Sequence, residues 1–156
     1  MKNSIGIHAL VWSGTWNLKD IENSIKLSKQ LGYDLIEIPL LDPFNFDIKN
    51  TKKYLDKYKF NSVTSLGLSE ETDISSSEEQ HRINGKKILE KALDVTFELG
   101  SDYMGGVLYS ALAKYHHPPN NESKKRSAEI LHHLSIKAKN YGIKTVSYTH
   151  LRAHET

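Results

Sequence analysis

Short apolar runs alternate with longer amphipathic segments along this chain, and that alternation limits the fold more than any other feature. Residues 4–10 and 34–40 have the length of strands, whereas residues 18–31 and 78–99 carry apolar side chains at helical spacing. Strands that are separated by helices pair in parallel through right-handed crossovers. The sequence therefore predicts an α/β fold in which helices cover a parallel sheet.

Each predicted unit ends at a glycine or a polar turn. Asn17 is suited to cap the first helix, and Gly32 and Gly142 are placed to end helices in the left-handed conformation. The predicted strands are residues 4–10, 34–40, 61–66, 103–109 and 143–145, and the predicted helices are residues 18–31, 48–57, 78–99 and 124–141.

Two parallel architectures, an open doubly wound sheet and a closed barrel, satisfy this pattern. The turn after the first strand reads VWSGTWN and lacks the G-x-G-x-x-G pattern of a dinucleotide-binding sheet, which favours the barrel. A complete (β/α)8 barrel usually needs about 250 residues, and this chain has 156. We therefore expect residues 1–145 to form a partial TIM barrel, the N-terminal half with about four βα units.

Composition narrows the classes of partner. A net charge of +2 is far from that of a polybasic nucleic-acid binder, so no nucleic-acid partner is expected. The absence of cysteine excludes disulfides and thiolate metal sites. No apolar run is long enough for a signal peptide or a membrane span, so a cytoplasmic location without membrane association is expected.

Candidate functional residues stand where the predicted strands end, because chemistry in a parallel barrel lies at that edge. His8 and Glu37 lie between apolar residues of the opposite strand face and should point into the barrel, and Trp12 follows in the loop. Each has a structural alternative: a hydrogen-bonded core histidine, an ion-paired glutamate and a loop-packing tryptophan.

The third and fourth strands end in further candidates. Gly67 allows close approach of a ligand to the backbone, and Tyr109 and Ser110 offer hydroxyls that suit a polyol. An ordinary turn and a core tyrosine are the alternatives. The histidine pairs at 116–117 and 132–133 are expected to be surface residues rather than metal ligands. Residues 132 and 133 are adjacent on a predicted helix and so point about 100° apart, and residues 116–117 lie in a loop that ends in two prolines.

Four segments, each at a predicted strand end, carry a family resemblance. GIHALVW at 6–12, LGYDLIEIP at 31–39, SLGL at 65–68 and LGSDYMGGVLYSA at 99–111 resemble the D-tagatose and D-psicose 3-epimerase branch of the xylose-isomerase-like barrels. The resemblance implies a metal-dependent isomerase that epimerises a ketose at C3 through an enediolate. It also implies Mn²⁺ as the ion, with Mg²⁺ or Co²⁺ as alternatives, a small-molecule sugar as partner and a homo-oligomeric full-length protein.

By position, the resemblance implies substrate contacts for His8, Trp12, Gly67, Tyr109 and Ser110, and it assigns no ligand role to Glu37. In relatives His8 aligns with an aromatic or histidine contact to the substrate. Leu112 stands where several relatives have tryptophan, which bears on substrate preference. The metal ligands of the family come from later strands, so no catalytic or metal-ligating residue is assigned here.

The end of the chain departs from the family pattern. In the family, the fifth strand reads like LEVVNRFE, and its first glutamate is both metal ligand and catalytic group. In this chain Tyr148 stands at the position of that glutamate. Residues 146–156, VSYTHLRAHET, are similar to the translated reading frame of a transposase sequencing adapter and are predicted to be a non-native tail. His150 and His154 lack the glutamate of an H-E-x-x-H motif. The chain as written is therefore predicted to be inactive.

Two other functions remain as hypotheses. An abasic-site endonuclease shares the barrel superfamily but calls for a basic DNA-binding face and a histidine-rich ligand cluster, and the sequence displays neither. A non-catalytic half-barrel would associate through its open edge. We expect aggregation or poor folding instead, because half a barrel leaves apolar strand faces uncovered.

Overall fold

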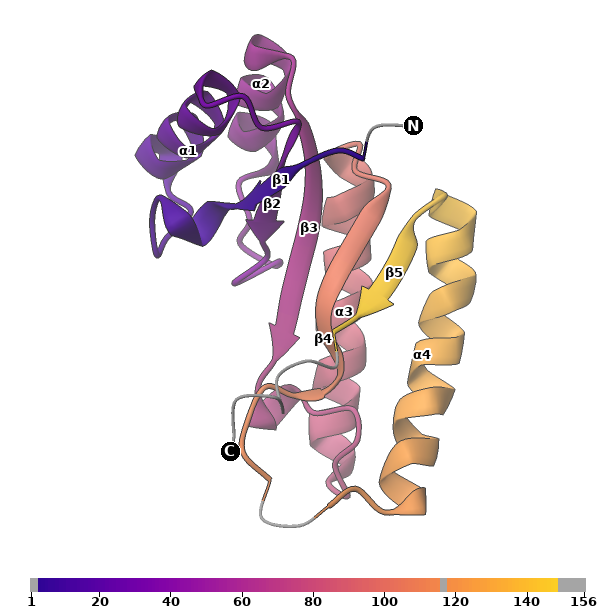
Figure 1. Ribbon diagram of the computed structural model, residues 1–156. Coiled ribbons are helices and arrows are strands. Elements are labelled where there is room, and N and C mark those ends of the chain that lie inside the picture. Colours follow the sequence, from indigo (N-terminus) through magenta and orange to yellow (C-terminus); the bar gives the residue numbers. More distant parts are fainter. Residues whose placement is uncertain (1–2, 116–117, 149–156) are drawn as a thin grey trace.

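Strands and helices alternate along the chain in the computed structural model, which describes residues 3–115 and 118–148 (Figure 1). The strands are β1 Gly6–His8, β2 Leu35–Pro39, β3 Asn61–Leu68, β4 Tyr103–Ala111 and β5 Lys144–Ser147. The helices are α1 Leu18–Gln30, α2 Ile48–Tyr58, α3 Glu79–Glu98 and α4 Asn121–Tyr141, and short 3-10 turns form at η1 Ala9–Val11 and η2 Glu70–Thr72.

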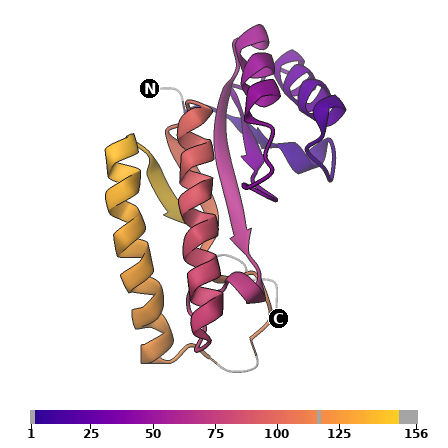
Figure 2. The ribbon, with the colours of Figure 1, turned by 180° about the vertical axis from the view of Figure 1, so that it is seen from behind.

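The five strands form one parallel sheet in the order β1-β2-β3-β4-β5, so each strand lies beside the one that precedes it in the chain. The four helices lie on one side of this sheet, as the front and back views show (Figures 1 and 2). This arrangement is that of half a TIM barrel and confirms the predicted fold class.

The hydrophobic core lies between the sheet and the helices. Ile36 and Ile38 of β2, and Met104 and Leu108 of β4, turn toward the helices and are at most 2% exposed. A hydrogen bond of 2.7 Å between the hydroxyls of Thr64 on β3 and Thr96 on α3 satisfies the polar groups at this buried contact. Because strand side chains alternate between faces, the neighbouring residues line the other side of the sheet, called the inner face below.

Gly106 allows β3 and β4 to pair closely. Its φ of +128° is one that side-chain-bearing residues rarely adopt, and a Cβ there would lie 1.9 Å from the carbonyl oxygen of Leu66. Gly106 thus has a backbone role in the sheet.

Element boundaries differ from the predicted ones where side chains cap the ends. β1 ends at His8, because the following residues turn into η1 under a cap from the His8 side chain. Helix α4 begins at Asn121, three residues before the predicted start, because the Asn120 side chain accepts a hydrogen bond from the Ser123 amide at 2.8 Å.

Strand β5 continues past the predicted boundary at residue 145, since Val146 and Ser147 pair with Gly105 and Gly106. Parallel pairing uses backbone groups that almost any sequence supplies. The non-native origin of residues 146–156 therefore stays a prediction, and residues 149–156 lie outside the described part.

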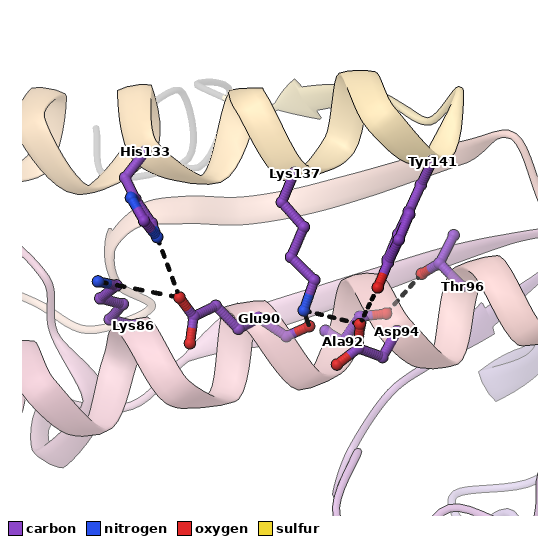
Figure 3. A network of polar contacts seen from close by, with 8 residues as sticks. All are labelled: Lys86, Glu90, Ala92, Asp94, Thr96, His133, Lys137 and Tyr141. Carbon is purple, nitrogen blue, oxygen red and sulfur yellow. Dashed lines mark hydrogen bonds and ion pairs between the residues drawn. The ribbon is translucent and has the colours of Figure 1, made fainter.

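A row of polar contacts joins helices α3 and α4 on the outer surface (Figure 3). The Lys137 amine lies 2.7 Å from Asp94 Oδ1 and donates to the Glu90 carbonyl, and the Tyr141 hydroxyl donates to the same Asp94 oxygen at 2.8 Å. His133 Nε2 lies 3.3 Å from Glu90 Oε1. These contacts hold α4 against α3 within the helix layer, on the side of the sheet opposite the inner face.

None of the helices in the described ranges combines the length and the apolar character needed to cross a membrane.

Candidate functional site

The polar side chains of the inner face gather near the carboxyl ends of the first three strands. His8 is paired in register with Glu37, and Pro39 with Ser65, which is paired in turn with Gly105. Residues that are paired across parallel strands turn to the same face. The register therefore brings side chains from three strands together at the edge where barrel enzymes bind substrate.

The His8 imidazole is held at both nitrogens. The Leu10 amide donates to Nδ1 at 3.1 Å, while Nε2 lies 3.4 Å from Ser65 Oγ and 3.5 Å from Glu37 Oε1. The side chains of His8 and Glu37 are 35% and 24% exposed, so the pair is reachable from the inner face. Glu37 has thus found the partner that a carboxylate on an apolar strand needs.

Tyr148 lies against Gly105 on the inner face. A Cβ on Gly105 would lie 2.7 Å from the Tyr148 hydroxyl, so glycine at 105 makes room for this ring. Burial raises the pKa of Tyr148, and the nearby charges of Glu37 and Tyr103 act in the same direction. Tyr148, which the resemblance aligns with the family glutamate, is thus a neutral phenol on the inner face.

Trp12 is fixed against helix α1. Its indole nitrogen donates to Ser28 Oγ at 2.9 Å, and Ser28 is itself buried within α1. This bond sets the orientation of the ring beyond η1. Its contact with substrate stays a prediction.

Gly67 is exposed near the end of β3, next to Leu112. A Cβ at position 67 would lie 3.3 Å from Leu112 Cδ2, so a larger residue there would displace the leucine. The pairing of β3 with β4 shifts here, from Gly67 with Val107 to Leu68 with Ala111. This irregularity sits where the resemblance implies a substrate contact.

Tyr109 and Ser110 lie half-buried in the last part of β4, between Val107 and Ala111 and so within this shift. The Tyr109 carbonyl accepts a hydrogen bond from the Ser127 hydroxyl of α4, so the backbone is anchored to the helix layer. Their contact with a polyol stays a prediction.

A tyrosine that sequence reasoning missed braces the loops at this edge. The Tyr115 hydroxyl donates to buried Asp73 at 2.5 Å and accepts from the Ala111 amide at 2.9 Å. Burial raises the pKa of Tyr115, and the hydrogen bond to Asp73 raises it further. The segment after β4 is thereby joined to the segment after β3.

The structure thus brings His8 and Glu37 together and adds Ser65, which the sequence analysis named only within the SLGL segment. Ser65 and Gly67 are two positions apart on β3, and this spacing indicates from the sequence that both face inward. Within residues 3–115 and 118–148, no group of three or more His, Cys, Asp or Glu side chains converges to hold a metal ion. The histidine pair at 116–117 lies outside the described residues.

Comparison of sequences identifies relatives. No protein-family model matches the chain. It is 40% identical over 138 residues to the L-ribulose 3-epimerase of Methylomonas sp. strain DH-1 and 36% identical over 152 residues to the ketose 3-epimerase of Arthrobacter globiformis. These matches cover 88% and 97% of this chain but 48% and 52% of the relatives. The chain therefore spans about half the length of the curated relatives it matches.

Solved structures agree with the sequence comparison. The D-allulose 3-epimerase from Methylomonas sp. in complex with D-allulose superposes with a TM-score of 0.90 at 38% identity, over 92% of this chain and 50% of that one. The D-psicose 3-epimerase from Clostridium cellulolyticum H10, crystallised with D-tagatose, superposes with a TM-score of 0.79 at 26% identity, over 92% and 51% of the two chains. By sequence and by fold, this chain belongs to the D-tagatose 3-epimerase-like family of sugar epimerases, which are isomerases.

Proposed function

We propose that the protein containing this chain epimerises a free ketose at C3 through an enediolate with the help of a divalent metal ion, Mn²⁺ in the first place. The observation that carries the proposal is the 40% identity with an L-ribulose 3-epimerase, together with the TM-score of 0.90 to a D-allulose 3-epimerase holding D-allulose. Residues on the inner face, above all His8, supply part of the sugar pocket in this proposal.

The part of the chain that the structure describes does not fit a metal site. It lacks a converging group of three acidic or histidine side chains, and Tyr148 takes the position that the family pattern gives to a glutamate. A neutral phenol is a poor ligand for a hard divalent ion that prefers carboxylate oxygens. We therefore propose that the ion is held elsewhere in the full-length protein and that these 156 residues alone are inactive.

The test begins with the source gene, sequenced by long reads across codon 145. A frame that continues into a glutamate-bearing fifth strand supports the proposal, and its product is then assayed beside the 156-residue chain. D-allulose and L-ribulose serve as substrates in D₂O with Mn²⁺, and conversion is followed by chromatography.

We expect the long product to form the C3 epimer and to incorporate solvent deuterium at C3, since an enediolate exchanges that proton. A chelator should abolish turnover, and added Mn²⁺ should restore it. The short chain should convert neither ketose. Turnover that survives the chelator would refute metal dependence, and turnover without deuterium uptake would refute the enediolate.

A further inference from the structure

The hydrogen bonds of His8 define which of its nitrogens carries the proton. The Leu10 amide points a donor at Nδ1 from 3.1 Å, so Nδ1 must act as the acceptor. A neutral imidazole with Nδ1 as acceptor carries its proton on Nε2. His8 is therefore in the Nε2–H form when neutral.

The proton on Nε2 faces two acceptors on the neighbouring strands. Ser65 Oγ lies at 3.4 Å, a long hydrogen bond, and Glu37 Oε1 lies at 3.5 Å, an ion-pair distance. Glu37 is the stronger acceptor of the two because it is a carboxylate. Both ring nitrogens are thus occupied by the protein, although the side chain is 35% exposed.

We infer that Glu37 is a positioning residue, which engages the Nε2–H of His8 so that the ring carbons, and not a free nitrogen, face the sugar. An imidazole held this way offers an apolar aromatic surface to the C–H groups of a ketose. This role for His8 rests on the proposed function, whereas the effect of Glu37 on the ring does not.

The first experiment measures the tautomer in the product of the source gene by long-range ¹H–¹⁵N correlation spectra of its histidines. We expect the Nε2–H pattern for His8. Glu37→Gln should leave the spectrum of His8 close to that of the wild type, because the amide oxygen still accepts a hydrogen bond. Glu37→Ala should keep the Nε2–H form, which the Leu10 amide fixes, but move the Nε2 and Hε2 chemical shifts, because Nε2–H loses its carboxylate partner. His133, which is paired with Glu90 on the outer surface, is the internal control and should not change.

An Nδ1–H pattern, or a His8 spectrum that is the same in Glu37→Ala, would overturn the inference. Should Glu37→Ala fail to fold, Glu37→Leu gives the same readout with an apolar chain of similar size.

The second experiment compares two His8 variants in the long gene product. His8→Phe keeps the ring and loses both nitrogens, whereas His8→Gln keeps a donor and an acceptor and loses the ring. We expect kcat/KM for the ketose to fall about tenfold further in His8→Gln than in His8→Phe. The reverse order would show that His8 serves through its nitrogens. An inactive long product would refute the proposed function and leave the tautomer result standing.

Discussion

Individual residues at the α3–α4 contact show how one carboxylate can hold two helices together. Burial alone would raise the pKa of Asp94, but hydrogen bonds from Lys137 and Tyr141 outweigh it and hold the pKa below its ordinary value of 3.8. Tyr141 also stacks on Phe97 of α3, with ring centroids 4.4 Å apart. Polar and aromatic contacts therefore act together along this edge of the helix layer.

Replacing Asp94 with Asn should destabilise the chain by about 1 kcal/mol at pH 7, a modest value because the site is partly exposed and screened. A pKa that folding lowers stabilises the folded state above the unfolded value and loses that effect as pH falls through the folded value. The difference between wild type and Asp94→Asn should thus shrink below about pH 4. Urea unfolding at pH 7 and pH 3 measures both effects.

Glu129→Gln on the exposed side of α4 is the matched control, because it removes the same charge without disturbing these contacts. It should leave stability at pH 7 within about 0.5 kcal/mol of wild type. An equal loss in both variants would mean that net charge, and not the Asp94 contacts, is responsible.

At the scale of elements, β5 is the strand that fits its surroundings least well. Thr145 and Ser147 turn toward the helices and line a cavity of about 370 Å³. The rest of the cavity wall is largely apolar and comprises Leu89, Leu93, Met104, Leu108, Ala128, Leu131, His132, Leu134 and Ser135. Thr145 and Ser147 thus place small polar side chains against leucines, and the non-native origin of residues 146–156 stays a prediction.

Ser147→Leu should stabilise the chain by about 1 kcal/mol, since part of the larger side chain would fill the apolar space beside this exposed position. The control is Val146→Leu, which adds a methylene on the opposite side of the same strand, where Val146 is 37% exposed. That change should have little effect on the melting temperature. Equal shifts in the two variants would contradict the assignment of the cavity to position 147.

On the scale of the whole molecule, the described sheet has two unpaired edges, β1 and β5, and an inner face that no layer covers. Exposed strand edges are templates for pairing with another chain, and apolar surface beside them adds to the attraction. We therefore keep the expectation that these 156 residues associate heterogeneously.

Val146→Lys should reduce that association, because an inward-facing charge on an edge strand opposes edge-to-edge pairing. Light scattering coupled to size exclusion should show a broad mass distribution for wild type and a narrower, lighter one for the variant. Lys144, also on β5, is already charged, so Lys144→Arg is the control and should behave as wild type. A single defined oligomer in both proteins would favour the half-barrel that self-associates specifically.

The sequence by itself determined the α/β class, the order of the elements and most of their positions, because these follow from local periodicity and from glycines and caps. The family resemblance could likewise be seen in four short segments. The structure confirmed the class and the order of the elements, and the comparisons confirmed the family resemblance.

Only the tertiary structure decided how side chains meet. His8 and Ser65 are 57 positions apart, and their contact depends on the register of three strands, which no local pattern encodes. The same holds for the approach of Gly106 to Leu66 and for the bond between Tyr115 and Asp73. Periodicity reports which face a residue occupies, whereas the partner it finds there is set by packing between distant segments.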